Sequence, residues 1–192
     1  MIFSKRKRTR IPGFDYSSSG FYFITLCTEN HKEILSRIVD DTECFKSTET
    51  SNSNNVGTIV PDGPKNGLFK PPKVILTRYG KIVKNRIEEM SDFYENISIN
   101  KYVIMPNHIH FLIEIKNGIF GPSGTMVPTA MYSVLSRFIG TFKRFTNKEI
   151  GHNIWQSRSY DHVVRNEKDY LEIWKYIEYN PVMWKDDKLF NF

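Results

Sequence analysis

The chain of 192 residues carries 27 lysines and arginines against 21 acidic residues, so its net charge is +6 and its pI about 9.2. Hydrophobic residues make up 40% of the sequence and aromatic residues 14%, a composition typical of a folded chain and not of a disordered one. No apolar run approaches the ~20 residues of a membrane span, and no apolar segment follows the basic N-terminus as it would in a secretory signal. Two cysteines without CxxC spacing predict a reduced, cytoplasmic protein, and the length suits a single domain over residues 1–192.

Basic residues gather at the N-terminus and on a later predicted helix. Phosphate backbones favour this pattern, because each contact with a basic side chain releases condensed counterions. The alternative to nucleic-acid binding is that these residues form only a solvated surface and a basic N-terminal tail. The candidate DNA-binding residues in these two groups are Lys5, Arg6, Lys7, Arg8 and Arg10, then Arg137, Lys143 and Arg144.

The first half of the chain contains two predicted elements and one insertion. Residues 20–27 are aromatic and β-branched and are bounded by polar segments, which predicts a buried strand. Residues 46–68 are rich in Ser, Thr, Asn and Gly, so we expect an insertion that packs little and is mobile. Residues 73–77 form either a short strand or the approach to a helix over 78–94, whose apolar residues follow helical spacing.

The second half predicts a hairpin over residues 97–115, because two β-rich runs flank Pro106 and Asn107. A Gly/Pro loop over 117–128, a helix over 131–147 and a strand over 161–165 follow. Asn166 is a plausible N-cap of a last helix, with Asp169 at the capping-box position, and Pro181 predicts its end near Asn180. The element order predicts an α+β fold of ferredoxin-like, split βαβ type with an antiparallel sheet.

His108 and His110 are the first candidate chemical feature. On a strand, residues two apart project from the same face, so both imidazoles point to one side while Ile109 and Phe111 point to the core. Two neutral imidazoles can hold one divalent cation. The alternative is a pair of ordinary histidines on a half-exposed face, directed away from the core.

The helix over residues 170–180 is the second feature. Tyr170, Ile173, Trp174 and Ile177 have the spacing of a buried stripe. Tyr176 and Asn180 are four residues apart on the flank of that stripe, so their side chains are neighbours, whereas Tyr179 points to solvent. A half-buried tyrosine beside a helix-end asparagine is the alternative without function.

The segment from Trp155 to Tyr160 interleaves aromatic residues with Gln156 and Arg158. Such a pattern suits base stacking and phosphate contacts. A tryptophan that anchors a loop to the core explains Trp155 equally well.

Four segments together resemble one family, the REP-associated tyrosine transposases, which are relatives of the single-tyrosine HUH transposases of IS200 type. The resemblance covers almost the whole chain, leaves 46–68 outside the pattern, and is carried by RIPGFDYSSSGFYFITLCTEN (10–30), PNHIH (106–110), IWQSRSYDHVVRNEKDY (154–170) and YIEYNPVMW (176–184).

The resemblance implies an HUH endonuclease fold with a C-terminal catalytic helix that carries the nucleophile Tyr176. It implies that His108 and His110 bind Mg²⁺ or Mn²⁺, with Asn180 as the third ligand. The expected reaction is cleavage and rejoining of single-stranded DNA near hairpin-forming repeats through a 5′-phosphotyrosine, in the bacterial cytoplasm at the nucleoid, by a monomer or a homodimer.

Two other classes of function remain open at this point. A non-catalytic module that binds single-stranded nucleic acid explains the charge and the aromatic residues, but not the histidine pair together with Tyr176. A zinc-dependent hydrolase lacks support, because no HExxH motif or further set of His and Cys ligands is present.

Overall fold

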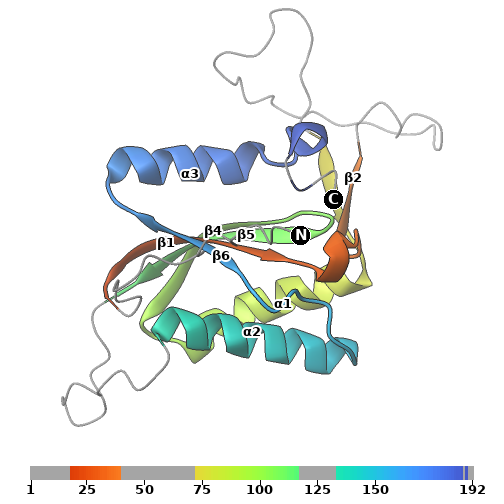
Figure 1. Ribbon diagram of the computed structural model, residues 1–192, viewed down its shortest axis with the longest axis horizontal. Helices are drawn as coiled ribbons and strands as arrows, with labels where there is room; N and C mark the ends of the chain where they lie inside the picture. Colours follow the sequence, from red (N-terminus) through yellow and green to blue (C-terminus); the bar gives the residue numbers. More distant parts are fainter. Residues whose placement is uncertain (1–17, 40–71, 117–132, 188, 190–192) are drawn as a thin grey trace, which may run out of the picture.

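The computed structural model describes residues 18–39, 72–116, 133–187 and 189, and the fold below concerns these residues (Figure 1). They contain six strands, three α-helices and two short 3-10 helices. In chain order these are β1 (Gly20–Cys27), η1 (Glu29–His31), β2 (Ser36–Val39), β3 (Lys73–Leu76), α1 (Arg78–Phe93), β4 (Ile97–Ile104), β5 (His108–Ile115), α2 (Val134–Ile150), β6 (Tyr160–Val164), α3 (Glu167–Tyr179) and η3 (Trp184–Asp186).

An antiparallel sheet with the strand order β4-β5-β1-β6 forms the centre of the molecule. β4 and β5 form the hairpin predicted over 97–115, with a register shift between Ile99 and Lys101. β5 also pairs with β1 along its whole length, which places Cys27 opposite His108. The predicted order of strand, helix, strand, strand, helix, strand and a further helix is therefore confirmed, and the mixed α/β class with it.

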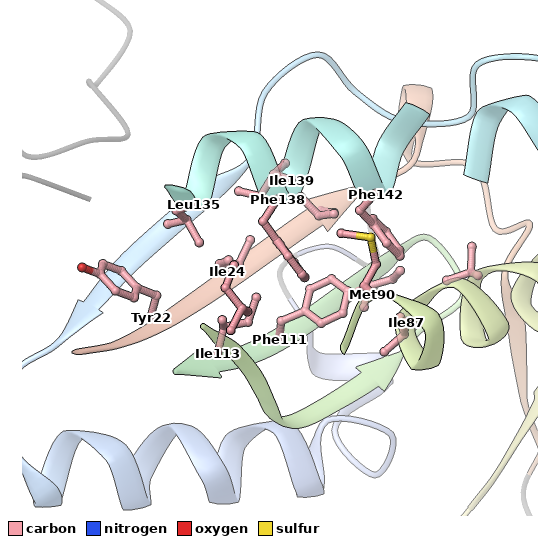
Figure 2. Close-up of a cluster of buried hydrophobic side chains, with 14 of the residues drawn as sticks. Tyr22, Ile24, Ile87, Met90, Phe111, Ile113, Leu135, Phe138, Ile139 and Phe142 are labelled. Carbon is pink, nitrogen blue, oxygen red and sulfur yellow. The ribbon is translucent and has the colours of Figure 1, made fainter. Parts of the chain in front are cut away.

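The sheet has helices on both faces: α1 and α2 lie on one side and α3 on the other (Figure 1). The larger core lies under α1 and α2, where Ile24 and Phe111 of the sheet pack with Phe138 and Phe142 of α2 (Figure 2). A smaller core lies under α3. Its buried members are Phe23, Leu112 and Ile177, and Tyr170, Ile173 and Trp174 of the predicted stripe pack against them.

Side chains fix the ends of the helices. Ser133 caps the N-terminus of α2, and Gly151 ends that helix with a left-handed φ of 92°, so the helix extends past the predicted residue 147. Asn166 caps α3 as expected, with its side chain accepting a hydrogen bond from the Asp169 N–H. The capping-box interpretation of Asp169 is wrong, because its carboxylate accepts from the Arg165 N–H and contacts His162 instead of returning to Asn166.

A two-stranded ribbon of β2 and β3 precedes α1, and of these only the second was anticipated, as one of two alternatives for residues 73–77. The basic residues of the N-terminus, the insertion at 46–68 and the loop at 117–128 lie outside the described residues. Among the helices that are described, none is long and apolar enough to cross a membrane.

Candidate metal and tyrosine site

β5 presents His108 and His110 on the face of the sheet that α3 covers. Their Nε2 atoms lie 3.0 Å apart, and their rings are 4.5 Å apart between centroids. Both side chains are buried, with 0% and 2% exposure. The expectation of a half-exposed face directed away from the core is wrong, because α3 and the turn after it cover this end of the sheet. In that turn Trp184 lies 5.9 Å from the His108 ring.

Hydrogen bonds hold both imidazoles by the nitrogen that points away from the pair. Nδ1 of His108 lies 2.7 Å from Oδ1 of Asn107, an oxygen that can only accept, so Nδ1–H donates and Nε2 keeps its lone pair. Nδ1 of His110 lies 2.8 Å from Oγ1 of Thr25 on the neighbouring strand. This arrangement directs both Nε2 atoms to a common point, as in histidines that bind metals.

Burial keeps the histidine pair neutral. It lowers the pKa of His108 to about 4, although the carboxylate of Asp187 acts in the opposite direction. Burial also lowers the pKa of His110, and the nearby His108 lowers it further. Neutral imidazole is the form that coordinates a cation, so the pair is in its ligand state at neutral pH.

Two oxygen-bearing side chains complete the site, and they come from the end of α3 and the turn after it. Asn180 is 1% exposed, and its Oδ1 has no hydrogen-bond partner among the described residues, whereas its Nδ2 donates to Oδ2 of Asp187 over 2.9 Å. One carboxylate oxygen of Asp187 and one ring nitrogen of each histidine all lie within 4.8 Å of one another. Asp187 was not anticipated from the sequence, where nothing distinguishes it from the adjacent Asp186.

The donor set fits a divalent cation. Two nitrogens 3.0 Å apart can share one ion, whose bonds to nitrogen are about 2.0–2.1 Å long. A carboxylate and an amide oxygen add the hard ligands that Mg²⁺ and Mn²⁺ prefer. The buried Oδ1 of Asn180, which has no partner, is the kind of atom that a bound cation satisfies.

Tyr176 lies beside this group. Its hydroxyl oxygen is 3.3 Å from Nε2 of His110, and its ring packs 5.9 Å from that of Phe23. The side chain is 46% exposed, so its oxygen adjoins the candidate metal site while one side of the ring faces solvent. Burial raises the pKa of Tyr176 to about 12, and the negative charge of Asp187 contributes in the same direction.

The other two tyrosines of α3 do not reach the histidines. Tyr170 packs its ring against Phe21, 4.9 Å away, at the opposite end of β1 from the site. The side chain of Tyr179 is exposed, and within the described residues it has no ring contact and its hydroxyl has no hydrogen-bond partner. Of the three, only Tyr176 has its hydroxyl within hydrogen-bonding distance of the histidine pair.

Basic residues of α2 line three hollows of about 650, 330 and 640 Å³, whose walls also include residues 151–159. Lys143 borders all three, Arg158 the first two and Arg144 the third. Arg144 and Arg158 are exposed there, and Arg137 is exposed near the start of the helix. Lys143 is different, because its Nζ donates to the backbone oxygens of Gln156, Ser157 and Arg158 at 2.7, 3.4 and 3.2 Å. Burial lowers the pKa of Lys143 to about 8.

Trp155 is not available for base stacking, since only 1% of it is exposed. Its indole N–H donates to Oγ1 of Thr146, and its ring packs against Phe142. The alternative interpretation, a tryptophan that anchors the loop to the core, is the correct one for this residue. Gln156, one position later, is half-buried at the edge of the largest hollow.

No family model matches this chain. The chain is 28% identical over 199 residues to an uncharacterised protein of Haemophilus influenzae, covering 96% of this chain and 93% of that one. It is 34% identical over 84 residues to a REP-associated tyrosine transposase of Escherichia coli, covering 44% of each. The fold is similar to that of a solved REP-associated tyrosine transposase bound to a REP hairpin, with a TM-score of 0.52 at 19% identity over 95% of this chain and 77% of that one.

Proposed function

We propose that this chain, which belongs to the REP-associated tyrosine transposase family, cleaves and rejoins single-stranded DNA through a covalent phosphotyrosine intermediate. One observation carries the proposal: the hydroxyl oxygen of Tyr176 lies 3.3 Å from Nε2 of His110, at the edge of a group that can hold a divalent cation. A binding module needs no such arrangement of a nucleophile and buried ligands.

In the proposed reaction the oxygen of Tyr176 attacks the scissile phosphorus, and the bond from phosphorus to the 3′ oxygen breaks. The phenol loses its proton and the departing 3′ oxygen gains one, so a 5′-phosphotyrosine and a free 3′-OH result. The new ester conserves the energy of the phosphodiester, so a second 3′-OH can attack it and restore the DNA without ATP.

His108 and His110 would hold Mg²⁺ or Mn²⁺ together with oxygen donors from Asn180 and Asp187. When bound, such a cation polarises the phosphate and stabilises the charge that develops on it. The pKa of Tyr176, about 12 in the protein without metal, means that the phenol is protonated at neutral pH and needs such help to attack. Asn180 also holds the Asp187 carboxylate by a hydrogen bond, so it orients one oxygen donor while it presents another.

The proposed substrate is single-stranded DNA next to a hairpin-forming repeat, by analogy with the relative that was solved with a REP hairpin. The exposed Arg137, Arg144 and Arg158 supply positive charge for the DNA backbone. Lys143 supports the loop that carries Arg158, through its bonds to the backbone of residues 156–158. Action in the cytoplasm at the nucleoid, as a monomer or a homodimer, belongs to the same proposal.

The same proposal includes the finer description of the fold. In the sheet order β4-β5-β1-β6, α1 lies in the connection from β1 to β4 and α2 in the connection from β5 to β6, so each helix joins two strands that have a third strand between them. This pattern supports a split βαβ arrangement of HUH endonuclease type. In this proposal the chain is a single domain. The helix α3 follows the split βαβ unit, lies on the face of the sheet opposite α1 and α2, and bears the nucleophile.

The test uses a DNA strand labelled at its 3′ end, with one hairpin and a single-stranded flank, incubated with the protein and Mn²⁺. We expect a labelled band that survives SDS and shifts to the mass of a protein–DNA adduct, and that disappears when EDTA replaces the metal. A protein that retards the same DNA in a native gel, yet forms no adduct with any flank sequence of a randomised pool, is a non-catalytic binding module.

A further inference from the structure

Tyr160 is an exposed aromatic residue at the start of β6, the edge strand of the sheet. Its exposed fraction is 52%. Alternate residues of β6 face α3: Val164 packs in the core under α3, and His162 contacts Asp169 of that helix. Because side chains alternate along a strand, Tyr160 projects from the same face as these two residues.

The register of the sheet places Tyr160 in one row with the candidate site. Thr25 of β1 is opposite Tyr160 on one side and opposite His110 on the other. Thr25 also holds the imidazole of His110 through its hydroxyl. Tyr160 is thus two strand spacings, about 10 Å, from the strand that carries His110. The oxygen of Tyr176 lies at the His110 end of this row.

Tyrosine is common in edge strands and needs no ligand there. The two tyrosines of α3 that pack on this face of the sheet, however, have ring partners: Tyr170 contacts Phe21 edge-on and lies against Trp174, and Tyr176 packs against Phe23 and His110. Within the described part of the chain, the ring of Tyr160 contacts no other ring and its hydroxyl has no hydrogen-bond partner. The exposed ring of Tyr160 therefore lies in the same row of the sheet as His110, without an aromatic partner among the described residues.

We propose that Tyr160 is the platform on which an unpaired base next to the attacked phosphate stacks. The proposal rests on the proposed function, because it takes its occupant from the DNA strand that reaches Tyr176. Every base has a flat face, so a tyrosine ring binds it without regard to sequence. Arg158, two residues earlier and exposed, supplies positive charge for the phosphates of the same strand. The three hydrogen bonds from Lys143 fix the backbone of the segment that leads to Tyr160.

The proposal is tested by binding, in a Tyr176→Phe background that cannot form the adduct. Fluorescence anisotropy with a labelled hairpin strand should show that Tyr160→Ala weakens binding by roughly 5- to 150-fold, the effect of losing one stack worth about 1–3 kcal/mol. Tyr160→Phe keeps the ring and should retain the affinity. Phe93→Ala removes another exposed aromatic residue, which lies on α1 at the other face, and serves as the control.

A second measurement identifies the base. DNA strands are made that each lack one base of the flank. One of these strands should bind more weakly to the protein that keeps Tyr160. The same strand should bind the Tyr160→Ala protein as well as the intact strand does. Equal affinity of the Tyr160→Ala and Tyr160→Phe proteins overturns the stacking proposal, and the adduct assay then still decides the proposed function separately. Failure of both proteins to bind hairpin DNA, with no adduct formed by the native chain, overturns both proposals.

Discussion

The hydroxyl oxygen of Tyr176 lies 3.3 Å from Nε2 of His110, although the two residues are 66 positions apart in the sequence. β5 places the histidine and α3 places the tyrosine, so the contact depends on how α3 packs across the sheet. Leu112 of β5 and Ile177 of α3 meet in the small core, together with Phe23 of β1. The cation–π contact of Lys101 with Trp174, 4.2 Å, and the ion pair of Lys101 with Glu178 add to the docking of α3 on β4.

His108→Ala and His110→Ala should each lower stability as well as abolish cleavage. Each substitution leaves a cavity under α3 and removes a buried hydrogen bond, to Asn107 or Thr25. We expect a loss of about 1–3 kcal/mol in the free energy of unfolding of the metal-free protein, measured in urea. His152→Ala, an exposed histidine after α2, is the control and should change it by less than about 0.5 kcal/mol. Unchanged stability of the first two variants would mean that the pair is not buried in solution.

The stability of the metal-free protein should fall as the pH falls between 6.5 and 4. Unfolded histidine has a pKa near 6.5, whereas burial lowers the pKa of His108 to about 4 and that of His110 in the same direction. In this window the unfolded state takes up protons that the folded state excludes, so acid favours unfolding, and above the window the effect is absent.

Urea unfolding in EDTA at several pH values measures this dependence. A His108→Gln, His110→Gln double variant retains polar side chains that do not titrate in this window. Subtracting its profile from that of the native chain removes the contribution of the acidic residues. Parallel profiles for the two proteins would show that the histidines titrate normally.

Asp187→Asn should weaken binding of Mn²⁺ by about 10-fold or more, whereas Asp186→Asn should leave it unchanged. The two residues are adjacent and both follow α3, but only Asp187 has a carboxylate oxygen grouped with the histidine nitrogens. Asn180→Ala should also weaken binding, because it removes Oδ1 and the hydrogen bond that holds Asp187. Isothermal titration calorimetry on each variant gives the affinities. Equal effects of the two aspartate variants would remove Asp187 from the site.

Gly80→Ala and Gly140→Ala should have opposite effects, although both glycines lie within α-helices. A Cβ at Gly80 would collide with the backbone oxygen of Leu35, whereas a Cβ at Gly140 meets nothing within 4 Å. Gly140→Ala should stabilise the chain by up to about 1 kcal/mol through helix propensity. Gly80→Ala should lower the melting temperature, because the approach of α1 to residue 35 must open. Thermal denaturation by circular dichroism separates the cases, and stabilisation by Gly80→Ala would contradict the packing of α1.

The sequence predicted those parts of the fold that depend on local pattern. Alternation along residues 108–115 placed the two histidines on one face, and helical spacing separated Tyr176 from Tyr170 and Tyr179. It did not predict that the face would be covered, because the pattern of β5 alone says nothing of how α3 packs above it. Asp187 was missed since its place depends on the path of the chain after Asn180, which no periodicity encodes.

The segment from Trp155 to Tyr160 illustrates the same limit. Its aromatic residues look alike in the sequence, yet Trp155 is in the larger core and Tyr160 is exposed on the opposite face. A single polar partner from a distant element helps to hold Trp155 inside: the hydroxyl of Thr146 accepts a hydrogen bond from its indole N–H.

The central claim, that Tyr176 is the nucleophile, is tested most directly by locating the DNA adduct on the protein. Hairpin DNA is incubated with the native chain and Mn²⁺, the adduct is digested with trypsin and nuclease, and the modified peptide is sequenced by mass spectrometry. The account predicts a nucleotide phosphate on Tyr176, no adduct for Tyr176→Phe, and an adduct for Tyr179→Phe. A modified Tyr179 or Tyr170, or an adduct that persists in Tyr176→Phe, would contradict it.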